Sequence, residues 1–370
     1  MCRLFLVNQL GRFCPGRFHC HHRHPSIRYP GGHISNTFAR SPLTGTTRAT
    51  RTVVALATIG AVALSGLLLA SPAQAATPAV RVSTAAQLKT ALASATAGQT
   101  ITLADGTYSG TFTLATNGTS GNPITLTGSR KAILTSGSKS SGYGLHVTGD
   151  YVTLAGFSVT NSGKGIVLDG SSNSTIAGVD VGTIGSEGIH VRTSSSNVVV
   201  RDSIVHDTGL VKPGSGEGIY IGSSVNNWST IMGSSTKADA SNNVLVQNNT
   251  LRNTAAEGID IKEGTSGGRY LNNTFDHAGF SGANNADSWI DVKGNNNTLT
   301  GNTGNDAAQD AIQVHDVLTG WGRNNTFSAT TITGTVPGYE INLAVSASNN
   351  NTITCKTTVA KAGLTNRTCT

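Results

Sequence analysis

The chain has 370 residues and a formal net charge of +7, but the charge is unevenly distributed. Residues 1–76 hold eight Arg and no Lys, Asp or Glu, so the remainder has 18 basic and 19 acidic residues, a net charge of about −1. This balance gives no support for a nucleic-acid partner. The apolar residues recur periodically, which argues against a disordered chain.

The first 75 residues have the composition of an exported precursor rather than of a folded domain. An apolar run at 53–70 is followed by an Ala-Gln-Ala cleavage site that ends at Ala75. This order predicts an N-terminal extension and a secretory signal peptide over 1–75, and a folded domain over 76–370. A transmembrane anchor is the alternative, but the run is short. We therefore expect a secreted, extracellular protein that keeps no membrane anchor after cleavage and is a monomer.

The folded domain is predicted to begin with a helix at 83–96. Thr84 and Gln87 have the spacing of a capping box at its start. An alternating strand at 100–108 follows. A helix in this place would cover the open end of a solenoid, which otherwise exposes apolar core.

A short phrase recurs along the rest of the chain. Two apolar residues flank one variable residue, and a Gly stands before them in five copies. The pattern predicts short strands with two side chains inside and one outside, stacked as a solenoid. We therefore predict an all-β fold, a right-handed single-stranded parallel β-helix with an N-terminal capping helix. The phrase occupies residues 144–147, 165–168, 188–191, 218–221, 258–261, 289–292, 311–314 and 340–343.

Cysteine and asparagine supply two further structural predictions. Cys355 and Cys369 are the two cysteines of the predicted domain, and an exported protein is expected to join them in a disulfide. Asparagine also recurs at a similar place after successive phrases, which predicts a side-chain ladder that supports bent backbone. The residues concerned are Asn173, Asn197, Asn243, Asn297 and Asn351.

The spacing between phrases predicts a groove. Long segments at 208–216 and 275–288 precede phrase strands, and others at 222–242 and 315–325 follow them. Loops at both edges of one sheet build the walls of a groove, with the outward residues of the phrase strands as its floor. In stacking order, the expected outward pairs are His190 and Arg192, Tyr220 and Gly222, Asp260 and Lys262, Asp291 and Lys293, and Gln313 and His315.

Carboxylates stacked on this floor repel one another unless a positive group lies among them. Glu217, Glu257, Asp260 and Asp291 offer oxygen ligands only, a set that suits Ca²⁺. A ladder of salt bridges with neighbouring lysines needs no metal and is the alternative.

Lys262 and Lys293 are expected on adjacent coils, about 4.8 Å apart. Two ammonium groups at that separation favour the loss of one proton, so one pKa should be depressed and the lysine becomes a candidate general base. The alternative is that each lysine pairs with its Asp.

Aromatic and basic residues on the floor and walls are candidates for binding a sugar chain. Trp289 shares parity with Asp291 and is expected to point outward. The predicted substrate-binding residues are Arg192, Tyr220, Trp228, Trp289 and Trp321.

Several motifs can be compared with known sequences. Residues 98–108 and 121–126 are similar to an entry strand, and Glu257 stands five residues before Lys262, with an Asn-Thr-Phe sequence at 273–275 further on. In these features the chain resembles the pectate-lyase-like superfamily, and it is most similar to the alginate lyase and chondroitinase B family of polysaccharide lyases. It departs from that family at Lys293, where an Arg is usual, and at Ala255, where a second Glu is usual.

The resemblance implies β-elimination at a uronate residue of an anionic polysaccharide. Ca²⁺ neutralises the sugar carboxylate, Lys262 abstracts the proton on C5, and Lys293, His315 or Tyr220 assists the leaving oxygen. Two other functions stay open. A glycoside hydrolase could use Asp260 and Asp291 as acid and base, and a non-catalytic carbohydrate-binding or adhesive β-helix needs no such chemistry.

Overall fold

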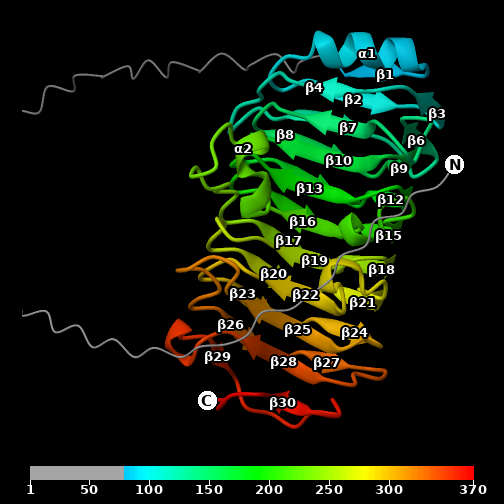
Figure 1. Ribbon diagram of the computed structural model, residues 1–370. Helices are drawn as coiled ribbons and strands as arrows, with labels where there is room; N and C mark the ends of the chain where they lie inside the picture. Colours follow the sequence, from blue (N-terminus) through cyan, green and yellow to red (C-terminus); the bar gives the residue numbers. More distant parts are fainter. Residues whose placement is uncertain (1–78) are drawn as a thin grey trace, which may run out of the picture. The chain divides into compact units, whose positions relative to one another are not determined.

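Along residues 79–370, which the computed structural model describes, short strands repeat in a fixed order and build a parallel β-helix (Figure 1). Each full coil contributes one strand to each of three parallel sheets, here called A, B and C. The predicted all-β solenoid is therefore confirmed. The extension and signal peptide predicted at 1–75 lie outside the described residues. Among the residues described, no helix has the length and apolar character needed to span a membrane.

Sheets A and B form two faces of the solenoid. Sheet A has the strands β1 (Val80–Val82), β2 (Thr100–Leu103), β5 (Ile124–Thr127), β8 (Val152–Ala155), β11 (Thr175–Ala177), β14 (Val199–Arg201), β17 (Leu245–Gln247), β20 (Arg269–Leu271), β23 (Thr298–Thr300), β26 (Thr326–Ser328) and β29 (Thr352–Ile353). Sheet B has β3 (Gly106–Ser109), β6 (Ala132–Thr135), β9 (Ser158–Ser162), β12 (Asp180–Ile184), β15 (Ile204–Thr208), β18 (Thr250–Thr254), β21 (Thr274–Ala278), β24 (Thr303–Asn305) and β27 (Thr331–Ile332).

Sheet C contains all the phrase strands. Ile189, Ile219 and Ile259 pair in register and are fully buried, so the apolar residues of the phrase stack into the core as predicted. The sheet also has a strand without the phrase at each end. Its strands are β4 (Thr113–Leu114), β7 (Tyr143–Val147), β10 (Lys164–Asp169), β13 (Ile189–Arg192), β16 (Ile219–Ile221), β19 (Ile259–Ile261), β22 (Ser288–Val292), β25 (Asp310–His315), β28 (Tyr339–Ala344) and β30 (Gly363–Thr365).

The predicted capping helix is α1 (Ala85–Ala93), which lies at the N-terminal end of the stacked strands (Figure 1). The Thr84 side chain accepts from the backbone of Gln87, and the Gln87 side chain accepts from the backbone of Thr84, so the capping box is confirmed. The strand predicted at 100–108 is instead two strands, β2 and β3, in different sheets. The chain bends between them and Gly106 has φ +144°, a conformation that other residues rarely adopt.

The asparagines of the predicted ladder fall into two separate ladders, and Asn249, Asn273 and Asn302 form a third. In the first, Asn197 Nδ2 donates to Asn173 Oδ1 (3.1 Å) and Asn243 Nδ2 donates to Asn197 Oδ1 (3.3 Å). These three residues have positive φ, which Asn tolerates better than most residues. The second ladder lies one position further along the coil, and it comprises Asn297, Asn325 and Asn351.

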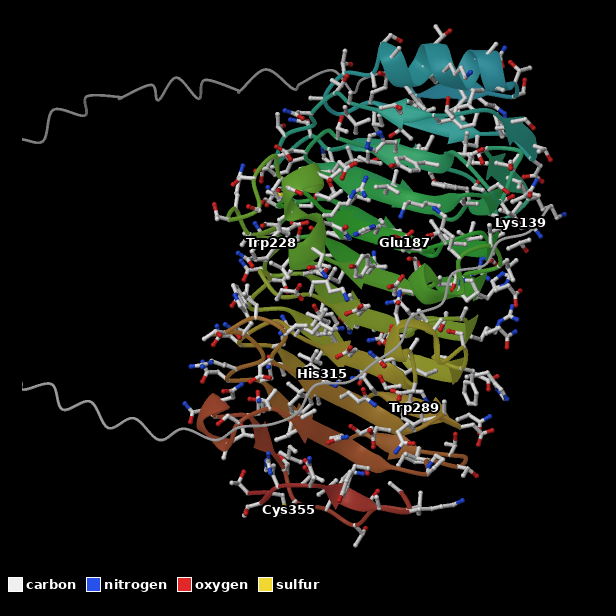
Figure 2. The ribbon with its side chains drawn as sticks, in the orientation of Figure 1. Lys139, Glu187, Trp228, Trp289, His315 and Cys355 are labelled. Carbon is white, nitrogen blue, oxygen red and sulfur yellow. A yellow bond between two sulfur atoms is a disulfide. The ribbon has the colours of Figure 1, made fainter. Side chains whose placement is uncertain are left out.

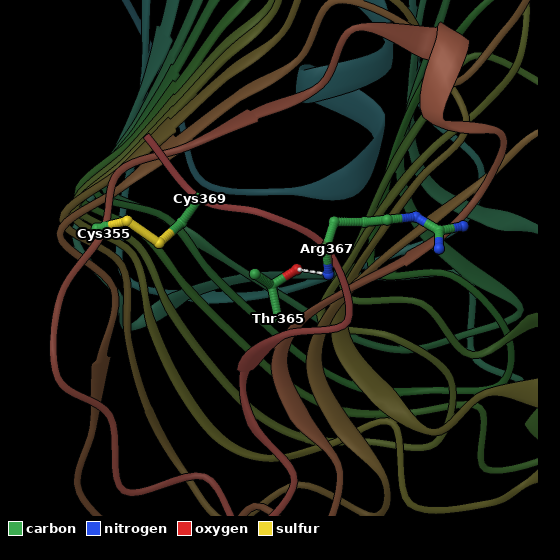
Figure 3. Close-up of a disulfide and its surroundings, with 4 residues drawn as sticks. All are labelled: Cys355, Thr365, Arg367 and Cys369. Atoms are coloured by element: carbon green, nitrogen blue, oxygen red, sulfur yellow. Dashed lines mark hydrogen bonds between the residues drawn. A yellow bond between two sulfur atoms is a disulfide. The ribbon is translucent and has the colours of Figure 1, made fainter.

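The C-terminal end is closed without a helix. Cys355 and Cys369 form a disulfide with a Cα–Cα distance of 5.1 Å, as predicted (Figure 3). Cys369 packs against the core, and the backbone N–H of Thr370 donates to Ile353 in the last strand of sheet A (2.8 Å). The final residues are therefore fastened to the last coil.

The loops that follow and precede sheet C contain the remaining helical turns. Two of these turns stand before sheet C strands and three stand after. They are η1 (Pro213–Ser215), η2 (Val225–Asn227), α2 (Trp228–Ile231), η3 (Ala283–Asn285) and η4 (Ala347–Asn349). The long segment predicted at 275–288 is shorter than expected, because its first residues belong to β21.

Candidate active site

The outer face of sheet C forms the floor of a cleft of about 760 Å³. All four long segments contribute to its lining, those of η1 and η3 at one edge of the sheet and those that follow β16 and β25 at the other. The first two are joined by Asn284, whose Nδ2 donates to the carbonyl of Gly214 (2.6 Å). Glu187 and His315 both line this cleft, several coils apart on the same face of the solenoid (Figure 2).

The register of sheet C places the predicted outward residues in a column. His190 pairs with Tyr220, Tyr220 with Asp260, and Asp260 with Asp291. Two residues further along each strand, a second column contains Lys262, Lys293 and His315. The adjacent Asp-x-Lys pairs predicted from the sequence are therefore confirmed, and both lysines line the cleft.

A continuous chain of ion pairs crosses this part of the floor. Asp260 accepts from Lys262 Nζ at Oδ2 (2.6 Å) and from Lys293 Nζ at Oδ1 (3.0 Å). Lys293 also contacts Asp291, and Asp291 in turn contacts His315 Nδ1 (2.9 Å). Carboxylates and cations thus alternate from coil to coil.

This alternation overturns the prediction that one lysine has a depressed pKa. Burial alone would lower the pKa of Lys262 and Lys293, but Asp260 and Asp291 outweigh burial and raise both pKa values above the ordinary range. The carboxylates lie between the two ammonium groups, so the lysines do not force one another to lose a proton. The hydrogen bond from His315 to Asp291 likewise raises the pKa of His315.

Three of the four predicted metal ligands come together. Glu217, Glu257 and Asp260 are buried, and each offers an oxygen within 4.8 Å of the other two. Among the described residues, Glu217 Oε2 is buried without a hydrogen-bond partner. Burial, followed by the charge of Asp260, raises the pKa of Glu217 to about 8 and raises that of Glu257 well above its usual range. Such an oxygen-only cluster fits a hard cation such as Ca²⁺. Asp291 stands apart, paired with Lys293 and His315.

Tyr220 lies at the centre of the floor. Its ring rests against His190, with centroids 4.3 Å apart, and Lys262 Nζ lies 5.2 Å from the Tyr220 centroid. Burial lowers the pKa of His190 to about 3, and its Nε2 donates to the carbonyl of Gly222 (2.8 Å). Burial, with the charges of Asp260 and Glu217, raises the pKa of Tyr220 well above its usual range, so the phenol keeps its proton.

Sequence reasoning missed Lys164, which lines the cleft, and Asp169, which pairs with Arg192 but is not among the lining residues. Lys164 contacts Glu187, and Asp169 is held by the predicted substrate-binding residue Arg192. Both flank the phrase at 165–168, and Asp169 pairs in register with Arg192. The parity rule that selected Arg192 would have selected Asp169 had it been applied one coil earlier.

The sequence predicted that Trp289 points outward and binds sugar on the groove floor, but this prediction is wrong. Its side chain is 0% exposed, stacks on Phe275 with centroids 6.1 Å apart, and donates from Nε1 to the carbonyl of Asp306 (2.6 Å). It occupies the phrase position that is Gly in other coils, and at Gly258 a Cβ would meet the same Phe275 ring. Strict alternation fails here, because Trp289 and Ile290 are adjacent in β22 and both side chains are fully buried.

The other two tryptophans do not offer a ring to the cleft either. Trp228 is 4% exposed, and its Nε1 donates to the carbonyl of Ser223 (2.9 Å), which ties it into its own loop. Trp321 is half-buried in the loop after β25 and is not among the residues that line the cleft. Of the predicted substrate-binding residues, Arg192 and Tyr220 line the cleft.

Comparisons with known proteins agree with this architecture. The profile of the Pel9A-like right-handed β-helix region matches residues 68–214, which supports the predicted handedness. An alginate lyase from Paenibacillus sp. str. FPU-7, known from its crystal structure, has 35% sequence identity to this chain. The two structures superpose with a TM-score of 0.69, and the match covers 79% of this chain and 96% of that chain. Pectate lyase Pel9A is 15% identical, with a TM-score of 0.57 over 79% of each chain, and shares the fold. No curated protein sequence gave a significant match.

Proposed function

Since this chain belongs to the family of right-handed β-helical polysaccharide lyases that includes the Paenibacillus alginate lyase, we propose that it cleaves a uronate-containing polysaccharide by β-elimination in the cleft on sheet C. One observation carries the proposal. The Lys262, Lys293 and His315 side chains meet at the floor of this cleft, beside the Tyr220 ring. Cationic groups and a phenol at one place suit an anionic sugar whose C5 proton must be removed.

Lys293 and His315 are assigned to the uronate carboxylate. A positive charge beside that carboxylate stabilises the negative charge that develops when the C5 proton leaves. Asp291 contacts both residues, which orients them and favours their protonated forms. An ammonium group on a flexible lysine with no ion-pair partner would be less well positioned beside the carboxylate.

Lys262 is assigned to proton abstraction. Its ammonium must first lose a proton to solvent, and Asp260 opposes this loss, so the reaction should be favoured at alkaline pH. The amine then takes the C5 proton, the C5–H electron pair forms the C4–C5 double bond, and the bond from C4 to the leaving oxygen breaks.

Tyr220 is assigned to the leaving oxygen. Among the described residues its hydroxyl has no hydrogen-bond partner, and its raised pKa keeps it protonated across the working range. It can therefore donate its proton as the C4–O bond breaks, and Lys262 and Tyr220 exchange protons with water afterwards. His190 lies against the Tyr220 ring and supports its orientation.

Glu217, Glu257 and Asp260 are the residues that would hold Ca²⁺. The buried, unpartnered Glu217 Oε2 and the all-oxygen donor set support this assignment. Bound there, Ca²⁺ would supply further positive charge beside the uronate carboxylate.

Export is proposed from the sequence alone, and N-terminal sequencing of protein recovered from culture medium would test cleavage after Ala75.

The test is the ultraviolet absorbance of the unsaturated uronate product. Purified protein is incubated with alginate, polygalacturonate and chondroitin, with Ca²⁺ or with a chelator. An absorbance increase that is lost in Lys262→Ala and kept in Lys89→Ala supports the proposal. Lys89 lies on α1, away from the cleft, so it is the matched control. Release of reducing ends without absorbance would indicate a hydrolase, and no reaction with any uronate would refute the proposal.

A further inference from the structure

We propose that the cleft has a second carboxylate-binding position, at Arg192, which holds a uronate residue two coils away from the one that reacts. This inference rests on the proposed function and deepens it. It assigns the protein to acidic chains that carry more than one uronate, rather than to an isolated uronate in a neutral chain.

The guanidinium of Arg192 is held rigidly by the protein. Nε donates to Asp169 Oδ1 (2.6 Å), and Nη2 donates to Asp169 Oδ2 (3.0 Å) and to the Tyr143 hydroxyl (3.2 Å). The Arg192 side chain is 11% exposed. A guanidinium fixed along one edge loses little conformational freedom when its other edge binds a ligand.

The remaining nitrogen of the guanidinium, Nη1, is available to a ligand. Among residues 79–370, Nη1 of Arg192 has no hydrogen-bond partner, yet it is not one of the buried unpartnered atoms, so it reaches solvent. Arg192 lines the same cleft as Lys262 and Lys293. The free N–H groups of a charged guanidinium are strong donors to a carboxylate.

Asp169 does not block this position. Besides Arg192, its oxygens accept from Thr193 Oγ1 (2.9 Å) and contact His146 Nε2 (2.9 Å). Burial alone would raise the pKa of Asp169, but the hydrogen bonds from His146 and Arg192 hold it well below its usual range. The carboxylate is therefore engaged within the protein, and Arg192 keeps its Nη1 group for a second anion.

The spacing along the solenoid sets the distance between Arg192 and Lys262, the residue assigned to proton abstraction. Arg192 is the last residue of β13, and the residue at the same register after β19 is Lys262, with Gly222 between them after β16. Two coil steps separate Arg192 from Lys262 by about 10 Å. Gly222 has φ +79°, and a Cβ there would lie 2.5 Å from Thr265 Cγ2, so no side chain stands at the step between Arg192 and Lys262.

The test measures binding of saturated oligouronates by calorimetry in the Lys262→Ala background, so that the ligands stay intact. A disaccharide, a tetrasaccharide and a hexasaccharide of the cleaved polymer are compared. Affinity should rise with length, and Arg192→Gln should weaken hexasaccharide binding about ten- to hundredfold while leaving the disaccharide unchanged. Arg192→Lys keeps Asp169 paired but loses the planar fork, and should show an intermediate loss.

Arg201→Gln is the matched control, because Arg201 pairs with Asp202 on sheet A with its side chain 50% exposed, outside the cleft. Equal weakening at every length, or no weakening in Arg192→Gln, overturns the second position while the lyase function stands. If no oligouronate binds and no polymer is cleaved, the proposed function fails and this inference with it. Thermal unfolding of each variant confirms that a loss of affinity is not a loss of folding.

Discussion

Replacing Asp260 by Asn should destabilise the protein by about 3 to 5 kcal/mol, because it leaves buried ammonium groups without their carboxylate. Asp260 is 2% exposed and contacts Lys262 Nζ at 2.6 Å and Lys293 Nζ at 3.0 Å. Asn keeps the shape but not the charge. Lys293 retains Asp291, whereas Asp260 is the only ion-pair partner of Lys262 among the described residues. The cost therefore arises mainly at Lys262.

The assay is urea unfolding with a chelator present, so that loss of a bound cation is not counted. Asp202→Asn is the control, because the Asp202–Arg201 pair is largely exposed and its removal should cost about 1 kcal/mol or less. Adding Lys262→Met to Asp260→Asn removes the unpaired charge and should restore part of the loss. If Asp260→Asn and Asp202→Asn shift the urea midpoint equally, the ion pairs do not support the floor as argued.

Three further outcomes are expected. Burial would raise the pKa of Asp169, but hydrogen bonds from His146 and Arg192 outweigh burial and lower it. The stabilisation that Asp169 contributes is therefore complete above its unfolded pKa and is lost as pH falls through its folded pKa. Below about pH 4, the urea midpoint of Asp169→Asn should fall less steeply with pH than the midpoint of the wild type. Ca²⁺ should raise the thermal midpoint of the wild type but not of Glu217→Gln, and an equal rise in both would contradict the proposed ligands. Trp289→Ala should cost about 3 to 5 kcal/mol in urea without changing KM, since the ring is in the core, and a raised KM at full stability would contradict this placement.

The repeat made the fold readable from the sequence. Apolar residues such as Ile219 and Ile259 stack directly, so one short phrase predicts the strand, its inward face and its register. The strands at the two ends of the solenoid were harder to predict from the sequence. β4 and β30 lack the phrase, and the bend at Gly106 separates two strands that alternate as if they were one. Local alternation reports which side chains are apolar, but not where the backbone turns a corner.

The same limit explains the outcome at the site. The alternation of side chains along a strand correctly placed Asp260 and Lys262 on the floor. It misplaced Trp289, because Trp289 and its neighbour Ile290 are both buried although they are adjacent in β22. The lysine pKa values also depended on a fact that spacing does not contain: Asp260 reaches across to the lysine of the next coil. A single rotamer choice there decides whether two ammonium groups face each other or share a carboxylate.

The charge balance of the floor connects the acidic cluster to substrate binding. Lys164 pairs with Glu187, and Lys262 and Lys293 pair with Asp260 and Asp291. Within residues 79–370, Glu217 and Glu257 therefore have no ion pair with a lysine. Two ionised carboxylates beside the reacting sugar would repel a polyanion. Burial raises their pKa values, to about 8 for Glu217, so protons neutralise them when no cation is bound. Ca²⁺ would do the same at the higher pH that Lys262 requires as a base. The pair that repels substrate when ionised is thus also the pair best placed to hold a cation.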